Sequence, residues 1–563
     1  MIHDTMKITS TSIVILTLSL LGSFSAFAAS VRPDAGQTNQ ELQKQPTLTT
    51  PKALPSLPIE NNADKKESTN NTVYIPVKTL RVEDSSVFTA AELEALVADL
   101  VDGERTLAEL EAGAERITSY YRKHGYLVAR AYLPAQDILD GLVTIKVIEG
   151  QLDQLRIFNT ARLSDARAEH YFDNIKSGAG LQIYPIERAL LLLNDTPGIG
   201  QANASLEPGS NIGTTDLLVE LKPSSPFNAN VKLDNFGNRY TGKNRLDAEL
   251  KLNSPLKIGD QFTLRALGSD LGTTYSRIAY SIPLASNGLR LGAAYSDTHY
   301  KLGREFASLQ AHGSATSRNL YITYPLIRSQ TANISTTLNW ENKKLIDKTD
   351  IPVSNINKQV SLSSLELSGD LRDTLGGGGV NTFALTLSRG TLTMDADSLT
   401  TDQNSAKSNG AFTHINLNTS RLQYLNDSNT LSLTLSGQLA NKNLNSSEKF
   451  SLGGIYGVRA YPSGEASGDE GWLANLSLQH SFSPTLKGLI FYDAGSVTIN
   501  HKPYTTDTNH RFLSGVGFGA NILFLGVQLD AYAAWRGTNS KPQSEPDNTS
   551  DKPRLWVQAK KQF

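Results

Sequence analysis

Residues Ser451–Gly471 read SLGGIYGVRAYPSGEASGDEG, a loop rich in Gly, Ser and Asp that contains Val458, Arg459 and Tyr461. Because glycine has no Cβ, such a loop can bend sharply and pack closely against other backbone. Its arginine is either exposed without a fixed partner or held by a carboxylate. The next alternating segment offers a candidate carboxylate, Asp493 in the sequence FYDAG. The loop therefore predicts an Arg459–Asp493 pair if the two segments meet.

The composition of the 563-residue chain excludes several classes of function. The length exceeds one ordinary core and predicts more than one domain. A formal net charge of −2 with 19% charged residues argues against binding nucleic acid through bulk electrostatics. The absence of cysteine excludes disulfides, thiolate metal sites and cysteine nucleophiles. The nine histidines show no zinc-ligand spacing, so we expect no enzyme, no cofactor and no metal.

The first 28 residues have the pattern of a secretory signal peptide. Lys7 precedes an apolar run over Ile13–Phe24, and Ala26 and Ala28 supply a small-x-small cleavage site. The run is short of the roughly 20 residues that span a bilayer as a helix. No later apolar run is long enough for a membrane helix. The mature chain is therefore predicted to be periplasmic, secreted or a β-barrel, whose lipid face is hidden in alternation.

The segment after the signal peptide is polar and divides into two parts. Within residues 29–45, a short helix is expected over Asp34–Gln45, with Asp34 as a plausible N-cap. The proline-rich composition of residues 46–72 is that of a linker. Such a linker is long enough to tether a small helix across the lumen of a barrel.

Residues 73–226 change to a mixed α/β pattern that occurs twice. Residues 73–150 show the order strand, helix, helix, strand, strand. The first strand is expected over Tyr74–Val82, and the helices over Ala90–Val101 and Thr106–His124. The same order recurs over residues 151–226. This repetition predicts two small α+β domains, with a single α+β domain as the alternative.

Residues 227–563 alternate between apolar and polar side chains. Leu431, Leu433 and Leu435, for example, alternate with serine and threonine. Lipid-facing barrel strands show this pattern, and the length fits 16 strands of about 10 residues with their connections. A soluble β-sandwich also alternates, but it rarely needs so many strands and does not explain a terminal strand that ends at Phe563.

Inside such a barrel, the arginine of the loop needs a partner. A charge removed from bulk water is costly unless it is paired. Asp493 shares one strand face with Phe491 and Gly495, so it can point into the lumen. A guanidinium pairs with a carboxylate through two hydrogen bonds, which would fix the orientation of the loop as well as its charge.

Four segments together resemble the two-partner secretion outer-membrane transporters (TpsB), the haemolysin activation/secretion family of the ShlB/FhaC/HecB type. They are the loop over Ser451–Gly471, the strand with Asp493, PDAGQTNQELQ over Pro33–Gln43, and LDNFGNRYTGKNR over Leu233–Arg245. The resemblance implies a mostly β fold. A 16-stranded antiparallel transmembrane β-barrel over 227–563 would follow two small α+β POTRA domains and an N-terminal plug helix.

The resemblance also implies residue roles. The loop over about 451–471 would insert into the pore, where Val458, Arg459, Tyr461 and Asp493 form the loop and its lock. The plug helix would include Asp34, Gln40 and Leu42. Ala460 stands where many members of the family have glycine. Lys561, two positions before Phe563, stands where the usual outer-membrane signature has an apolar residue. Alanine is small, so we expect no functional change at position 460.

The implied function is protein export. A transporter of this family recognises, with its periplasmic POTRA domains, the secretion domain of one large TpsA-type exoprotein. It exports that partner through its barrel to the surface of a Gram-negative bacterium without ATP. The partner classes are haemolysins, adhesins, haem-binding proteins and contact-dependent toxins. The protein would be a monomer in outer-membrane lipid, inserted by the barrel assembly machinery, and would bind no nucleic acid.

Two other classes of protein remain as alternatives. An outer-membrane protein insertase of the same superfamily commonly has more POTRA units and no plug helix. A receptor-type channel needs a larger globular plug than the residues before position 73 supply, and a passive porin needs no periplasmic units. Two α+β units together with the predicted helix favour export.

Overall fold

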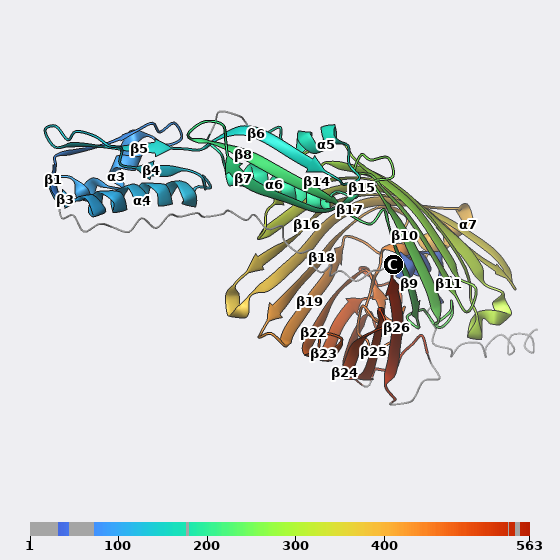
Figure 1. The fold of residues 1–563 in the computed structure, drawn as a ribbon. Coiled ribbons are helices and arrows are strands. Elements are labelled where there is room, and N and C mark those ends of the chain that lie inside the picture. Colours follow the sequence, from blue (N-terminus) through green and yellow to red (C-terminus); the bar gives the residue numbers. More distant parts are fainter. Residues whose placement is uncertain (1–31, 44–72, 176–179, 539, 546–551) are drawn as a thin grey trace, which may run out of the picture.

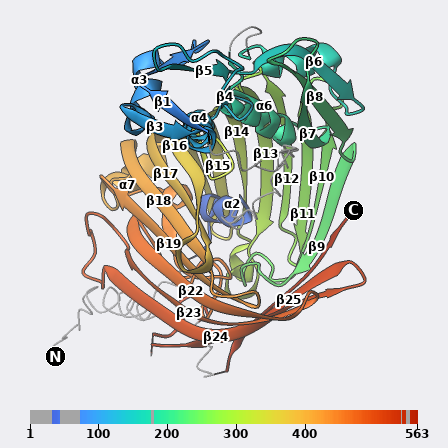
Figure 2. The ribbon, with the colours of Figure 1, turned by 60° about the vertical axis from the view of Figure 1, so that its left-hand side comes forward.

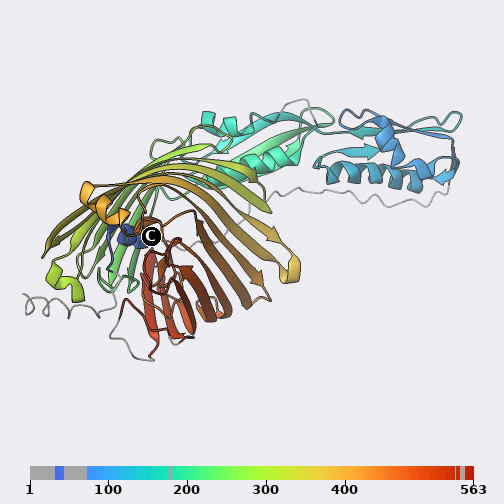
Figure 3. The same ribbon diagram turned by 180° about the vertical axis from the view of Figure 1, so that it is seen from behind.

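The computed structural model describes residues 32–43, 73–175, 180–538, 540–545 and 552–563. The predicted signal peptide (1–28) and linker (46–72) lie outside these residues. The described chain forms a large β-barrel with two small α+β units in a row at one end (Figure 1), an arrangement that is seen from behind in Figure 3. In this described part, no helix is both long and apolar enough to cross a membrane.

The first α+β unit packs two helices on small sheets. Its longest helix, α4, begins at a capping box in which Thr106 and Glu109 bond each other's backbone N–H. Its buried face includes Leu110, Ile117 and Tyr121. In the three-stranded sheet, β5 pairs parallel with β2 and antiparallel with β4. The elements are β1 (Tyr74–Val77), β2 (Thr79–Glu83), α3 (Ala90–Ala95), η1 (Ala98–Leu100), β3 (Gly103–Thr106), α4 (Leu107–Lys123), β4 (Arg130–Tyr132) and β5 (Leu142–Ile148).

The second unit repeats this architecture and rests on the barrel. Its sheet has β8 parallel to β6 and antiparallel to β7, as β5 is to β2 and β4. Two hydrogen bonds of 2.6 and 3.1 Å from Arg328, at the turn between β14 (His312–Arg328) and β15 (Ala332–Asp350), hold Asp195 of the unit. The unit is therefore fixed to the rim of the barrel. Its elements are β6 (Gln151–Asn159), α5 (Asp165–Glu169), η2 (His170–Phe172), α6 (Ile183–Asp195), β7 (Ile199–Pro208) and β8 (Thr214–Pro223).

The barrel is closed by 16 antiparallel strands, which confirms the predicted fold class and excludes a sandwich. The last strand, β26, closes on the first, β9, over only five residue pairs. Phe563 exchanges two backbone hydrogen bonds with Ala229, so the chain end is part of this closure. The strands are β9 (Phe227–Asp234), β10 (Arg245–Asn253), β11 (Gln261–Ser269), β12 (Thr274–Pro283), β13 (Arg290–Lys301), β14 (His312–Arg328), β15 (Ala332–Asp350), β16 (Val353–Asp373), β17 (Gly379–Met394), β18 (Gly410–Tyr424), β19 (Asn429–Ala440), β22 (Glu470–Ser483), β23 (Leu486–Thr498), β24 (His510–Phe524), β25 (Val527–Arg536) and β26 (Arg554–Gln562).

The outer face of the barrel is apolar. Leu365 and Leu387 are cross-strand partners and are about half exposed, as are Leu367 and Leu385 one step along the same pair of strands. The residues between them, Glu366 and Thr386, face inward. This alternation places a leucine-rich belt on the outside and polar groups on the lumen side, as in transmembrane barrels.

Two segments occupy the lumen. Helix α2 (Ala35–Gln43) lies inside the barrel, surrounded by its strands (Figure 2). The β19–β22 connection, residues 441–469, is named the pore loop here and contains η5 (Ser446–Glu448), β20 (Phe450–Ser451) and β21 (Ser467–Gly468). The strands alternate in direction from β9, so the pore loop starts at the end opposite the α+β units and folds back. Three shorter elements, η3 (Arg304–Leu309), η4 (Leu375–Gly377) and α7 (Ala396–Gln403), lie in other connections.

Candidate functional site in the barrel lumen

The pore loop is a hairpin whose apex needs glycine. Phe450 pairs with Gly468 and Ser451 with Ser467, which closes the two limbs of the loop. At the apex, a Cβ on Gly457 would lie 1.8 Å from the carbonyl oxygen of Leu452, closer than any real contact. Only glycine lets the backbone turn so tightly there. This turn presents Arg459 to the barrel wall.

Arg459 and Asp493 are in direct contact. Arg459 Nε lies 2.8 Å from one carboxylate oxygen of Asp493, and Nη2 lies 2.7 Å from the other. The backbone N–H of Arg459 also donates to the same carboxylate, at 3.1 Å. Asp493 is fully buried. The predicted bidentate geometry thus ties the loop apex to strand β23, with the pair removed from bulk water.

Three further residues complete this contact, of which the sequence had placed only Phe491 on the face of Asp493. Asn475, the cross-strand partner of Asp493, donates a 2.7 Å hydrogen bond to its carboxylate. The guanidinium carbon of Arg459 lies 3.5 Å from the ring centroid of Phe491, a cation–π contact. Trp556 Nε1 donates a 2.7 Å hydrogen bond to the carbonyl oxygen of Arg459. The β22–β23 hairpin register could have identified Asn475, whereas Trp556 lies 97 residues from Arg459.

The two residues that flank Arg459 in the motif have different surroundings. Val458 is buried in an apolar cluster of the loop and the wall. The Tyr461 hydroxyl lies 2.9 Å from Thr538 Oγ1 and donates to the carbonyl of Ser540 at 3.0 Å. Both residues are fully buried. They therefore pack and orient the apex on either side of the ion pair.

Ala460 packs against a glycine of the wall. A Cβ on Gly515 of β24 would lie 2.6 Å from the Ala460 methyl, so the wall must be bare there. Gly515 is also the cross-strand partner of Asp493. The alanine of this chain therefore fits because the wall opposite it has no side chain.

The second limb of the pore loop has its own anchor, Glu465, which sequence reasoning missed. Its buried carboxylate accepts backbone hydrogen bonds from Gln543 and Ser544 at 2.8 and 2.9 Å and pairs with Arg511 of β24. Gln543 and Ser544 lie in the β25–β26 connection. No local pattern in the sequence connects these segments, because their contact depends on how the pore loop meets the β25–β26 connection in the closed barrel.

Helix α2 is held in the lumen by contacts that include the three plug residues named from the sequence. Asp34 is its N-cap: one carboxylate oxygen accepts the Gln37 N–H at 2.9 Å, and the other accepts the Ser446 hydroxyl at 2.6 Å. Gln40 Nε2 donates to the Lys449 carbonyl at 2.8 Å. Leu42 is buried with two side chains of the wall, those of Leu267 and Tyr275.

Polar contacts to the barrel wall complete the seat. The Ala35 N–H donates to Asp347 of β15 at 2.7 Å, and Thr298 of β13 donates to Asn39 at 3.1 Å. At the other end of the helix, Arg265 of β11 donates to the Leu42 carbonyl at 3.2 Å. The helix therefore touches the pore loop on one side and the wall on the other.

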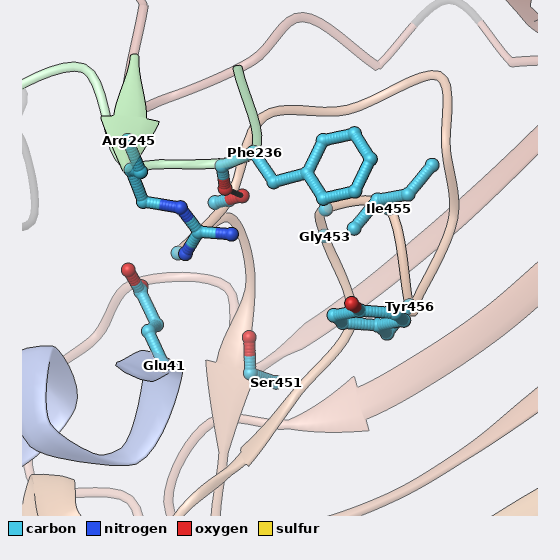
Figure 4. A pocket seen from close by; sticks show the side chains of 10 residues that line it. Glu41, Phe236, Arg245, Ser451, Gly453, Ile455 and Tyr456 are labelled. Carbon is cyan, nitrogen blue, oxygen red and sulfur yellow. Dashed lines mark hydrogen bonds between the residues drawn. The ribbon is translucent and has the colours of Figure 1, made fainter. Parts of the chain in front are cut away.

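The space between helix, wall and loop is small. A cavity of about 30 Å³ is lined by Glu41 of α2, Arg245 of β10 and Tyr456 of the pore loop, among others. Figure 4 shows these side chains converging from the three elements. This volume holds one or two waters. Within the described residues, no group of three or more His, Asp or Glu side chains is placed to hold a metal ion.

A closed barrel with a lipid-facing belt, α+β units at one end and a lumen occupied by a helix and a loop defines an outer-membrane β-barrel transporter. The chain belongs to the family described as haemolysin secretion/activation protein ShlB/FhaC/HecB, whose model matches residues 213–522. The model of the ShlB-type POTRA domain matches residues 75–150. The family predicted from the sequence is confirmed, and the first α+β unit is a POTRA domain.

Relatives along nearly the whole chain agree with this family. The heme/hemopexin transporter protein HuxB of Haemophilus influenzae (strain 86-028NP) is 29% identical over 550 residues, covering 94% of this chain and 95% of the relative. The outer membrane transporter CdiB of Dickeya dadantii (strain 3937) is 25% identical over 560 residues, covering 93% and 96%. The solved structure of CdiB from Escherichia coli matches with a TM-score of 0.72 at 20% identity, covering 99% and 100%.

These findings place the chain among the two-partner secretion transporters of the Gram-negative outer membrane. Its POTRA domain lies in the periplasm, and the pore loop enters the barrel from the cell surface. The insertase alternative has no better support, because the family model and the relatives are those of exporters.

Proposed function

We propose that this transporter exports one large exoprotein through a pore that helix α2 and the pore loop fill at rest, and that it performs no catalysis of its own. The observation that carries the proposal is the seat of α2. A helix of nine residues lies in the lumen and contacts both the wall and the loop. An extended polypeptide can pass this point only after the helix leaves.

The helix is suited to leave. An isolated helix of this length is marginal in water, so its structure depends on the seat. Several contacts that hold it are single hydrogen bonds between neutral groups, each worth about 1 kcal/mol net. The loop apex, in contrast, is held by the buried bidentate pair of Arg459 and Asp493. We therefore expect partner binding to displace α2 while this pair keeps the apex in place.

The α+β units are the proposed site of partner recognition. The second unit repeats the sheet order of the POTRA domain, which supports two POTRA domains over 73–150 and 151–226, with the barrel over 227–563. An extended segment of the partner's secretion domain can pair with an exposed sheet edge through backbone hydrogen bonds. Folding of the exported chain outside the cell then removes unfolded chain from the equilibrium, so no ATP is required.

The partner is proposed to be a TpsA-type exoprotein. Two relatives have names that refer to haem/hemopexin and haemolysin transport, which supports the haem-binding and haemolysin classes. The adhesin and contact-dependent toxin classes fit the same pore. The transporter is proposed to act as a monomer in outer-membrane lipid after insertion by the barrel assembly machinery, and without contact to nucleic acid.

The test compares secreted and surface proteins of cells with and without this chain. Loss of one very large polypeptide, with other outer-membrane proteins at normal levels, is the expected result and identifies the partner. A broad fall of many outer-membrane barrels would instead mean that the chain is an insertase, and the export proposal would then be wrong.

A further inference from the structure

The first limb of the pore loop has an anchor of its own, far from the Arg459–Asp493 pair. Lys343, on the inward face of β15, is buried, and its Nζ lies 2.9 Å from Glu448 of η5. In the barrel, β15 and β23 are separated by five strands. The two ion pairs therefore attach different parts of the loop to different sides of the wall.

The residues around Glu448 face the plug helix, while Glu448 itself faces the wall. Ser446 donates to Asp34, and the Lys449 carbonyl accepts from Gln40. A Cβ on Gly36 of the helix would lie 2.6 Å from Ser446 Oγ and 2.7 Å from Ser447 N. The backbone of this limb is therefore the surface that receives α2, and it leaves no room for a side chain at position 36.

We propose that Lys343 is a positioning residue for the plug: its ion pair with Glu448 holds the first limb of the pore loop where that limb receives helix α2. This inference rests on the proposed function in one respect, that α2 leaves the lumen during export. It adds a second latch, which acts on the seat of the helix rather than on the loop apex.

The surroundings of Glu448 direct its carboxylate to Lys343. Gln438 Nε2 donates to the Glu448 carbonyl at 2.9 Å, which fixes the backbone. The amide oxygen of Gln438 accepts from Asn416, whose own oxygen lies 2.7 Å from His414 Nδ1. The other ring nitrogen of His414, Nε2, lies 3.5 Å from the Glu448 carboxylate. The limb is thus held by a connected network.

Charge explains why Lys343 is the key member. Its ammonium group lies between two carboxylates, Glu448 at 2.9 Å and Glu341 at 3.4 Å, and all three side chains are at least nine-tenths buried. Removing the lysine leaves two buried carboxylates side by side, and such a charge is costly without a partner. The limb would then move toward water, and the seat of α2 would move with it.

The experiment uses the full chain, which has no cysteine, so one introduced thiol reports alone. Thr38 is a suitable place in α2 because it is buried and its hydroxyl makes no hydrogen bond. In the purified Thr38→Cys transporter, the rate of reaction with a bulky maleimide measures how often the helix leaves its seat. Heat-modifiable migration on gels shows that the barrel is folded.

Lys343→Met is expected to raise the labelling rate by about tenfold or more. A tenfold change corresponds to about 1.4 kcal/mol in the free energy that separates the seated helix from the displaced helix. Lys344→Met is the matched control, since Lys344 is the next residue of the same strand and is exposed. Lys343→Arg keeps the positive charge and should stay close to the parent. Lys343→Met combined with Glu448→Gln removes one of the stranded carboxylates and should label more slowly than Lys343→Met alone.

Equal labelling rates of Lys343→Met and Lys344→Met in folded barrels would contradict the proposal that Lys343 positions the seat of α2. If Lys343→Met fails to fold, Glu448→Gln, which breaks the same ion pair from the loop side, is compared with Lys344→Met and decides by the same criterion. Labelling needs no partner protein, so it tests the latch separately from export. Loss of the exported polypeptide is measured in cells, and a normal latch in a chain that exports nothing would contradict only the proposed function.

Discussion

Trp556 in the last strand donates a 2.7 Å hydrogen bond to the carbonyl oxygen of Arg459, whose guanidinium is held by Asp493 in β23. One loop residue is therefore fixed by its backbone to one strand and by its side chain to another. The aromatic ring of Trp556 also packs edge-on against Phe236, which follows the first strand. The loop apex is thus attached both to the short β9–β26 closure and to β23, with β24 and β25 between them.

The first prediction concerns the charge of this apex. Arg459→Ala leaves the carboxylate of Asp493 buried without its cation, at a cost on the order of 3–5 kcal/mol. We expect the loop to leave its seat and export of the partner to fall to a small fraction of the parent level. The measurement is an immunoblot of the secreted partner, with barrel assembly checked by heat-modifiable migration.

Asp493→Ala is expected to have the same effect, because it leaves the arginine without its acceptor. Arg459→Lys should restore export only in part, since an ammonium group cannot make the two parallel bonds and stacks less well on Phe491. Normal export by both alanine variants, in assembled barrels, would show that the pair has no part in the mechanism.

The second prediction separates the backbone contact from the ion pair. Trp556→Phe keeps an aromatic ring against Phe236 but removes the only hydrogen-bond donor of the side chain. The buried carbonyl of Arg459 then loses its partner, at a cost of about 1–3 kcal/mol. We expect a lower thermal midpoint of the purified barrel. Trp472→Phe is the control, since Trp472 lies on the exposed face of β22; equal midpoints for the two variants would contradict the prediction.

Much of the fold was predictable because local chemistry determines it. Alternation of leucine with serine and threonine predicts strands with one lipid-facing side, and Thr106 begins the longest POTRA helix as its cap. The helix expected over Ala90–Val101 is shorter, because the chain leaves the α conformation at Val97, with φ −127°, and continues as the short turn η1. The strand expected over Tyr74–Val82 is interrupted at Lys78, so β1 and β2 pair with different partners, β3 and β5.

The site was predictable only where one residue demanded another. A buried arginine needs a carboxylate, and strand alternation placed Asp493 on the inward face. The contacts of Glu465 with Ser544 and of Lys343 with Glu448 follow no such rule. They depend on the stagger of 16 strands and on which part of the wall each limb of the loop reaches. Short-range sequence patterns do not contain that information.

The third prediction concerns the POTRA domain, where Glu149 stands at the junction between the two α+β units. Burial raises the pKa of Glu149, but hydrogen bonds from Ser86, the backbone of Val87 and the Tyr121 hydroxyl outweigh burial and hold the pKa below its ordinary range. The pKa is therefore lower in the folded domain than in the unfolded chain. The stabilisation is complete above the unfolded value of about 4.3 and is lost as the pH falls through the folded value.

Tyr121→Phe removes one of these donors, and Tyr120→Phe is the matched control because the Tyr120 hydroxyl donates to exposed Glu92 instead. At pH 7, amide exchange of residues 85–88 in the full chain should be about fivefold faster in Tyr121→Phe, corresponding to about 1 kcal/mol. Below the folded pKa the Glu149 carboxyl is neutral, so the hydrogen bond that Tyr121→Phe removes is weaker. The difference in amide exchange rate between Tyr121→Phe and the parent, corrected for intrinsic rates, should therefore shrink. A difference that is independent of pH, or equal in both variants, would mean that the charge of Glu149 does not hold this segment.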